Sequence, residues 1–424
     1  MTEAGYILNI GSGYWQMPFL HAIRDLGHQI IAVDVDPLAP GFALADVSLA
    51  LSAHHPGPIF AQLAAMGLDS QVKGVLTTAA RGCITTAAEL ADWLGVLGPG
   101  LPLKSAEIIT DRLLFRSFLR ERGLPSPSFR TIAGPDDIPH DLSWPVMVKP
   151  LQGTTGGAGV LRAENLTEAR DAVENVRRVT TSHTGEVIVE EYLEGADVSL
   201  FGLVVEGRPR PVLLTERGVG GPTGFLPVTQ FAPAAVSPEA KSRIVSLFAR
   251  LAEELQVSRG PLYVEFRLTA GDLPFIIEVE PSVPANMDFL VAGTHGFSAS
   301  EVAFLSLLDQ PVPPFAEGAK GAAGLSMMYA PRSGHLTRLS ANATSSEQEP
   351  IGSITHSVLL RKRPGDIVLN ESAGDACALL YAQGAERTQV VETLDWLRAQ
   401  VVLEAEPVQE ATSASAAQRP DADQ

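Results

Sequence analysis

The sequence predicts an α/β unit followed by α+β units. Short apolar strands alternate with amphipathic helices through the first hundred residues, which is typical of a parallel sheet with crossover helices. Beyond them, strand-like runs come in pairs joined by Gly- and Asp-containing turns, which favours antiparallel sheets. A Pro-Ser-Pro stretch at Leu124–Pro127 marks the first boundary. We therefore expect units at 1–124, 125–205 and 206–405, followed by a disordered tail at 406–424 that has no apolar stripe.

Composition narrows the classes of function. The chain has 424 residues, 45% of them hydrophobic, and a formal net charge of −18. Such an acidic balance argues against a nucleic-acid partner, because neutralising phosphates requires a surplus of Lys and Arg. The two cysteines, Cys83 and Cys377, cannot form a disulfide framework or a metal cluster by themselves. We find no signal peptide and no apolar run long enough to cross a membrane, so a cytoplasmic location is the default expectation.

The chain opens with a pattern similar to a Rossmann βαβ unit. A strand at Tyr6–Ile10 ends in the glycine turn Gly11–Gly13, and a helix at Met17–Leu26 follows. Asp34 stands at the end of the next strand, where such units place an acid on a ribose. The third glycine of the dinucleotide pattern is replaced by Gln16. We therefore favour a structural turn over a nucleotide site.

The region after the first boundary carries a glycine-rich loop. Upstream of it, Ser105–Arg122 has the periodicity of one amphipathic helix. A strand at Val146–Lys149 leads into a loop whose glycines stand at 153, 156, 157 and 159. Backbone N–H groups in such a loop can approach phosphate oxygens, and a lysine beside it adds a positive charge. This order predicts a flap over phosphates, with an irregular surface hairpin as the alternative.

A predicted hairpin gathers three acids on one face. Its strands are Leu262–Thr269 and Phe275–Glu280, and a simple register places Glu265 opposite Glu278. Glu280 lies two residues further, hence on the same face. Like charges at this spacing are destabilising unless a cation such as Mg²⁺ binds them. A solvated acidic face is the alternative, and the hairpin alone does not decide between the two.

Taken in order, these motifs resemble the ATP-grasp superfamily, and within it the carboxylate–amine ligases, over about residues 6–310. The resemblance implies an ATP-grasp fold of two α+β subdomains, with ATP and Mg²⁺ as cofactors and Mn²⁺ as an alternative ion. The residues implied to hold ATP are Arg112, Lys149, Gly153, Thr154, Thr155, Gly156, Gly157, Glu190, Glu191, Leu193 and Asp197, the last of them on the ribose. Those implied to hold the metal are Glu265, Glu278 and Glu280.

Three positions depart from the family pattern. Arg112 replaces the usual lysine of an Asp-Lys pair, and Glu280 replaces an asparagine. Ser282 stands where the family has an arginine that steadies the phosphoryl group or the acyl substrate. Arg267 shares the strand face of Glu265, so we expect it to take over this grip. The alternative is a structural salt bridge between Arg267 and one of the hairpin acids.

The resemblance implies an ADP-forming ligase, with Lys149 and Arg267 as the expected catalytic residues. A carboxylate, expected to belong to an amino acid, would be activated as an acyl phosphate and joined to an amine. The partners are then small molecules, with a homodimer left open. The rivals are a bicarbonate-using carboxylase, a non-catalytic nucleotide-binding protein and, last, a dinucleotide oxidoreductase. The final unit, Gly318–Glu404, is more loosely similar to the C-terminal lobe of L-amino acid ligases.

Overall fold

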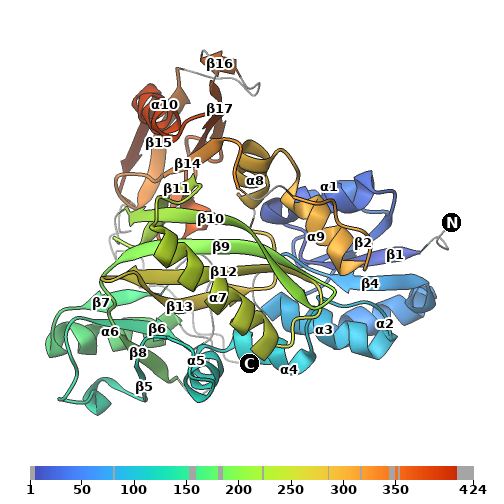
Figure 1. Cartoon of the computed structure of the whole chain (residues 1–424), viewed down its shortest axis with the longest axis horizontal. Coiled ribbons are helices and arrows are strands. Elements are labelled where there is room, and N and C mark those ends of the chain that lie inside the picture. The colour runs from blue at the N-terminus through green and yellow to red at the C-terminus, as the bar shows by residue number, and fades with distance from the viewer. Residues whose placement is uncertain are drawn as a thin grey trace, which may run out of the picture.

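The computed structural model describes residues 5–79, 82–151, 159–179, 185–221, 224–284, 286–315, 318–342, 349–351 and 354–407. Figure 1 shows them as helices and strands arranged around one long central sheet. The predicted loop residues Gly153, Thr154, Thr155, Gly156 and Gly157 lie outside these ranges, as does the tail from 408 onward. In the described residues, no helix is both long and apolar enough to cross a membrane.

The N-terminal unit is a parallel four-stranded sheet flanked by helices, as the alternation predicted. The strand order is β3-β2-β1-β4, and the pairs β1–β2, β1–β4 and β2–β3 are all parallel. The strands are β1 (Tyr6–Ile10), β2 (Gln29–Asp34), β3 (Val47–Ala50) and β4 (Val72–Leu76). The helices are α1 (Met17–Asp25), α2 (Pro56–Met66) and α3 (Gly82–Leu94).

The helix expected over Ser105–Arg122 is two helices. These are α4 (Leu103–Thr110) and α5 (Arg112–Glu121), and the chain turns between them at Asp111. Asp111 has extended backbone angles and its Oδ1 accepts a hydrogen bond from the backbone N–H of Leu114, as an N-cap does. An aspartate inside a helical pattern is thus a start signal here, and it fixes Arg112 at the first position of α5.

A smaller antiparallel sheet follows, in the order β5-β8-β6-β7, with helix α6 (Leu166–Val179) packed against it. Its strands are β5 (Phe129–Ile132), β6 (Val146–Pro150), β7 (Leu161–Ala163) and β8 (Val187–Glu191). Lys149 lies in β6, and Glu190 and Glu191 close β8. The sheet therefore brings these three side chains to one region.

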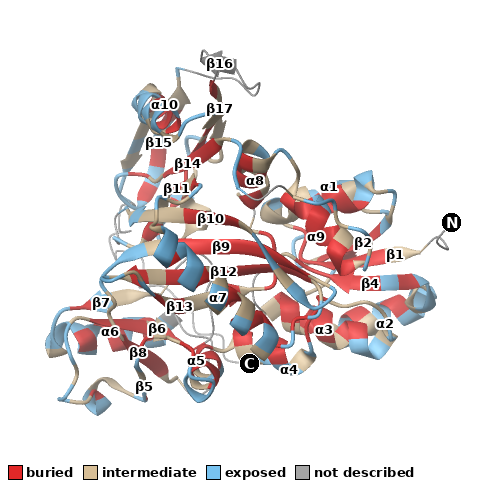
Figure 2. Cartoon of the chain, viewed as in Figure 1, coloured by how far each residue is buried: buried red, intermediate tan, exposed pale blue. Residues whose placement is uncertain are grey.

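The central sheet has nine strands in the order β13-β12-β9-β10-β11-β14-β19-β17-β16. Their bounds are β9 (Ala196–Val205), β10 (Arg208–Gly220), β11 (Leu226–Ala232), β12 (Gly260–Thr269), β13 (Leu273–Glu280), β14 (Ala322–Met328), β16 (Glu349–Ile351), β17 (Ile354–Leu360) and β19 (Ala378–Gly384). Figure 2 shows β9 and β12 buried along most of their length. The sheets thus divide before β9, not after Val205 as expected, because β9 pairs with both β10 and β12.

Helices cover both faces of the central sheet. On one face α7 (Pro238–Glu254) shares a core with α4 and α5, and on the other α8 (Met287–His295) and α9 (Ala299–Leu307) pack. Phe304 and Leu307 of α9 also pack into the N-terminal unit. A three-stranded sheet of β15 (Gly334–Ala341), β18 (Ile367–Val368) and β20 (Val401–Glu406), with α10 (Arg387–Gln400), completes the C-terminal lobe.

Candidate active site

One cavity of about 430 Å³ lies where the N-terminal unit, the small sheet and the central sheet meet. Ten of the predicted site residues fall within the described ranges, from Arg112 to Glu280, and all ten line this cavity. They come from α5, β6, β8, β9, β12 and β13 or the turns that follow them. Residues separated by more than 150 positions in sequence therefore share one space.

The acidic hairpin has the predicted pairing, but it reaches that pairing through a bulge. Glu265 is opposite Glu278, as expected, whereas Phe266 is opposite Ile276, so Ile277 is the extra residue. Such a bulge reverses the in–out alternation of a strand. It turns Val279 into the core and leaves Glu278 and Glu280 on the cavity side.

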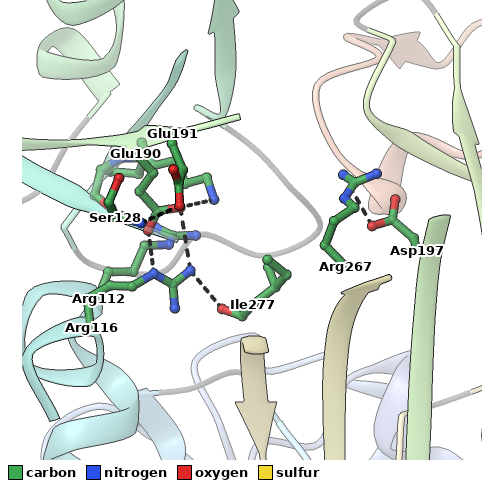
Figure 3. A network of polar contacts seen from close by, with 10 residues as sticks. Arg112, Arg116, Ser128, Glu190, Glu191, Asp197, Arg267 and Ile277 are labelled. Carbon is green, nitrogen blue, oxygen red and sulfur yellow. Dashed lines mark hydrogen bonds and ion pairs between the residues drawn. The ribbon is translucent and has the colours of Figure 1, made fainter. Parts of the chain in front are cut away.

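A buried ion-pair network joins α5, β6 and β8 (Figure 3). Lys149 Nζ donates to Glu190 Oε2 at 2.6 Å, and Arg116 Nε donates to Glu190 Oε1 at 2.7 Å. Arg116 Nη2 also donates to the carbonyl oxygen of Ile277 at 3.0 Å. Arg116 therefore connects Ile277, the bulged residue of the acidic hairpin, with Glu190.

The charges in this network set its protonation states. Burial alone would raise the pKa of Glu190, but the neighbouring cations Arg116 and Lys149 hold that pKa at about 2. Burial lowers the pKa of the Lys149 ammonium, and Glu190 opposes that shift. Glu190 is therefore an ionised counter-charge that holds Lys149 at the cavity wall.

Arg112, the residue in the position of the family lysine, lies beside this network. Its Nη1 donates to the carbonyl oxygen of Pro150 at 2.7 Å, and its backbone N–H donates to Leu151 at 2.9 Å. Both acceptors follow Lys149 directly, at the entrance to the glycine-rich loop. Arg112 thus fixes the chain from which that loop starts, and it lines the cavity as well.

A row of three charged residues crosses the central sheet. Asp197 of β9 is in register with Arg217 of β10 on one side and with Arg267 of β12 on the other. Arg267 Nη2 lies 3.2 Å from Asp197 Oδ1, and its Nη1 donates to the carbonyl oxygen of Gly195. Figure 3 shows the side chains of Arg267 and Asp197 pointing toward each other. Burial raises the pKa of the Asp197 carboxyl, and the two arginines oppose that shift. Asp197, the acid expected on the ribose, thus forms an ion pair with Arg267 and feels the charge of Arg217.

The side chain of Arg217 reaches diagonally across β9 to Glu265 of β12. Its Nη1 and Nη2 donate to Glu265 Oε1 and Oε2 at 2.6 and 2.7 Å. Ser199, the β9 residue in register with Glu265, is small enough to let the guanidinium pass. Among the described residues, no three His, Cys, Asp or Glu side chains form a group that could hold a metal ion. The three predicted metal acids share a cavity wall without forming a preassembled cluster.

The N-terminal glycine turn is tied to β2 by a hydrogen bond, and it also places residues in the cavity. The backbone N–H of Ser12 donates to Asp34 Oδ2 at 2.8 Å, so the acid that a dinucleotide site would use for a ribose accepts a hydrogen bond from the turn. Gly11 has a φ of +85°, and a Cβ there would lie 2.4 Å from the Ala79 side chain. The turn leads into a short 3₁₀ helix, η1 (Tyr14–Gln16), whose Trp15 and Gln16 line the cavity.

Residues 142–288 match the family model described as an ATP-grasp domain. The chain contains an ATP-grasp domain. Among curated proteins, a D-alanine–D-alanine ligase of Acidovorax ebreus strain TPSY is 26% identical over 257 residues, covering 57% of this chain and 74% of the relative. The residues matched by the family model include β6, β7 and β8 of the small sheet and the acidic hairpin, which confirms the resemblance drawn from the motifs.

Solved structures show the same fold over nearly the whole chain. The L-amino acid ligase of Bacillus licheniformis has a TM-score of 0.77 at 19% identity, covering 96% of this chain and all of that one. A biotin carboxylase domain of Hydrogenobacter thermophilus, solved with MgADP and bicarbonate, has a TM-score of 0.72 at 15% identity, covering 95% and 91%. The predicted α/β and α+β architecture of an ATP-grasp protein is confirmed.

Sequence reasoning missed two arginines of this site. Arg116 follows Arg112 by four residues and shares the buried face of α5 with Phe115 and Leu119. Two arginines on an apolar helix face are a signal that could have been used, because a buried charge requires a partner. Arg217 had no such signal. Its partner Glu265 lies 48 positions away on a strand that is not its sheet neighbour.

Proposed function

We propose that this protein is an ADP-forming ligase that activates a carboxylate as an acyl phosphate and joins it to an amine. The supporting observation is the cavity itself. Its wall carries three pairs of charged side chains, namely Lys149 with Glu190, Glu265 facing Glu278, and Asp197 with Arg267. This set provides the groups that phosphoryl transfer requires, namely cations to position phosphates and oxygen ligands for a metal. The ligase name of the matched relative agrees with it.

Two hairpin acids fit a magnesium ion. Glu265 and Glu278 are directly opposite across the strands, and both line the cavity. Mg²⁺ commonly takes one or two carboxylates and completes its shell with substrate phosphates, so no three-carboxylate cluster is required. When bound there, the ion would neutralise phosphate charge. Glu280 lies two residues beyond Glu278 on the same wall and can add an oxygen to the shell.

Lys149 suits the role of holding ATP phosphates. An ammonium has three N–H donors, and Glu190 engages one of them. Glu190 also keeps the flexible lysine side chain in one orientation, which reduces the entropy lost on binding phosphate. Glu191, Leu193 and Asp197 then line the part of the cavity proposed for the nucleoside.

The proposed reaction has two steps. A carboxylate oxygen of the first substrate bonds to the γ-phosphorus of ATP, and the bond to ADP breaks. The amine nitrogen of the second substrate then attacks the acyl carbon, phosphate leaves with the bonding electrons, and the nitrogen loses a proton. Because phosphate is a good leaving group, positioning and charge neutralisation carry most of the catalysis.

Arg217 is the cation we assign to the transferring phosphoryl group. In this structure it engages both oxygens of Glu265, the acid proposed to hold the metal. A metal on Glu265 would displace at least one of these hydrogen bonds. The released guanidinium lies on the wall of the same cavity and can then pair with phosphate oxygens, for which its planar fork is suited.

The proposal is tested with purified protein, ATP, Mg²⁺ and pooled amino acids, by measuring ADP and new products by mass spectrometry. Adding hydroxylamine traps an acyl phosphate as a hydroxamate whether or not the natural amine is present. ADP and hydroxamate together support the ligase. ADP formed only with bicarbonate would indicate a carboxylase, and ATP binding without turnover would indicate a non-catalytic protein.

A further inference from the structure

Tyr263 is a buried titratable residue of the cavity wall that has no part in the reaction described so far. It lies in β12, is 5% exposed, and lines the cavity. It also belongs to the hydrophobic core that includes Phe201 of β9 and Met287 of α8. A tyrosine at such a boundary packs its ring in the core and keeps its hydroxyl for a polar partner.

The charges that act on the Tyr263 hydroxyl belong to the cavity. They are those of Glu265, Arg217 and Glu280, all of which line it. Glu280 is directly opposite Tyr263 in the hairpin, and Glu265 lies two residues along the same face of β12. Burial and the two glutamates raise the pKa of the phenol, and Arg217 opposes that shift. The hydroxyl therefore keeps its proton at neutral pH and lies close to the acids proposed for the metal.

The proton of this hydroxyl is available for a ligand. Among the described residues, Ser199 of β9 interacts with the phenol and lowers its pKa, as a hydrogen-bond donor does. The pair does not reach the geometry of a full hydrogen bond, because the buried Ser199 Oγ has no hydrogen-bond partner there. A buried donor without an acceptor is costly. An oxygen atom of a ligand in the cavity would satisfy the phenol.

Tyr263 follows the proposed metal acid on the side away from the nucleoside. Arg267, Glu265 and Tyr263 share one face of β12, with roughly 7 Å between successive side chains. Arg267 pairs with Asp197, the acid proposed for the nucleoside, and Glu265 is proposed to hold the metal on the phosphates. ATP bound in this order ends with its γ-phosphate near Glu265. An acyl group bonded to that phosphate then lies one step further along β12, beside Tyr263.

We propose that Tyr263 is a catalytic residue whose hydroxyl donates a hydrogen bond to the acyl oxygen while the amine attacks. The inference rests on the proposed ligase function. As the amine nitrogen bonds to the acyl carbon, the carbonyl π electrons move onto the oxygen, which becomes negatively charged. The carbonyl re-forms when phosphate leaves with its bonding electrons, and the nitrogen loses its proton. A fixed donor aimed at this oxygen stabilises the transition state more than the acyl phosphate.

A neutral donor suits this position better than a cation. Glu265 and Glu280 flank the hydroxyl, so a lysine or arginine in place of Tyr263 would form an ion pair with one of them, as Arg217 does with Glu265. Such a pair would engage the donor and compete with the metal. A phenol forms no ion pair while it is protonated, and core packing of its ring fixes where its hydroxyl lies.

The experiment follows the two chemical steps separately in Tyr263→Phe, which removes the hydroxyl and keeps the ring. The protein is mixed with ATP, Mg²⁺ and the acid and amine identified from the pooled amino acids, and the reaction is quenched at short times. ADP reports the first step. Acyl phosphate that survives the quench is trapped with hydroxylamine, and mass spectrometry of the final product reports the second step. Tyr6→Phe is the matched control, since Tyr6 packs against the core of the N-terminal unit and is not among the residues that line the cavity.

We expect Tyr263→Phe to lower the kcat of product formation by about 100-fold, the scale seen when one oxyanion donor is removed. ADP should still form in the first turnover at nearly the wild-type rate, and the KM of ATP should stay unchanged. Acyl phosphate should then accumulate on the protein, which a purely structural defect would not cause. Tyr6→Phe should behave as the wild type.

A wild-type kcat in folded Tyr263→Phe would overturn the proposal. Equal losses of first-turnover ADP and of product, together with a lower melting temperature, would show that Tyr263 only supports the sheet. Both results leave the ligase function intact. Absence of ADP and of acyl phosphate in the wild-type protein would instead contradict the ligase function itself, and with it this role of Tyr263.

Discussion

Arg217 holds both carboxylate oxygens of Glu265, with Nη1–Oε1 and Nη2–Oε2 distances of 2.6 and 2.7 Å. The pair spans β9, because β10 and β12 are not neighbours in the sheet. It supplies the counter-charge that two facing glutamates require. Arg267, for which a salt bridge with one of the hairpin acids was the alternative prediction, instead forms its ion pair with Asp197. Two different arginines therefore pair with Glu265 and with Asp197.

Removing the hairpin acids should weaken metal binding in a graded way. Glu265→Gln and Glu278→Gln each remove a charged oxygen ligand, so we expect Mg²⁺ affinity in the presence of ADP to fall at least tenfold. Glu280→Asn should be the mildest change, since the family has asparagine at this position. Isothermal titration of Mg²⁺ measures this without turnover. Equal effects of all three substitutions would contradict the assignment.

Lys149→Ala should reduce kcat by about 100-fold or more, the scale seen when one preorganised charge is removed from a transition state. The fold should persist, because Glu190 keeps its ion pair with Arg116 at 2.7 Å. Turnover and melting temperature are measured together. Lys104→Ala is the control, since Lys104 is exposed on α4, away from the cavity. Normal ADP production by a folded Lys149→Ala protein would refute the role.

Local patterns were enough to predict most of the elements and the ten site residues that line the cavity. The strand before the glycine-rich loop, the acids that end β8 and the acidic hairpin each carry a short-range signal, and their order along the chain gave the family. The Glu265–Glu278 pairing was also predicted, although the simple register behind it holds only beyond the bulge at Ile277. Near the turn the strands are offset by one residue, which depends on contacts such as that of Arg116 with Ile277.

Contacts between distant segments could not be predicted. Arg217 meets Glu265 across an intervening strand, and Arg361 meets Trp15 across 346 positions of sequence (361 minus 15). Neither contact has a periodic or compositional signal, because each depends on sheet order and on how the lobes pack. The helix break at Asp111 had a local signal, an N-cap residue, but the apolar periodicity on both sides outweighed it.

Protonation of Glu190 should account for much of the fall in the free energy of unfolding at acid pH. Its folded pKa, about 2, lies below the ordinary value of 4.5, so its contribution is full above about pH 4.5 and is lost as pH falls toward 2. A shift of this size corresponds to up to about 3 kcal/mol. Denaturant unfolding at several pH values should show that Glu190→Gln reduces this fall. Glu191→Gln should keep it. An unchanged pH dependence in Glu190→Gln would contradict the prediction.

The last prediction compares the two arginines of the cross-strand row. Arg267 lies 3.2 Å from Asp197, the acid expected on the ribose. Arg267→Met should therefore weaken binding of the nucleoside and mainly raise the KM of ATP. Arg217 is bound to Glu265, at the phosphoryl end, so Arg217→Met should mainly lower kcat, by about 100-fold.

Measuring Mg²⁺ affinity distinguishes a catalytic role of Arg217 from a purely structural one. Because Arg217 occupies both oxygens of Glu265, its removal should raise Mg²⁺ affinity in the absence of nucleotide, measured by titration, even while kcat falls. A protein weakened only by loss of a partly buried ion pair would show a lower melting temperature and no gain in metal affinity. If Arg267→Met lowers kcat and Arg217→Met leaves it unchanged, the grip on the phosphoryl group belongs to Arg267, as the strand pattern first indicated.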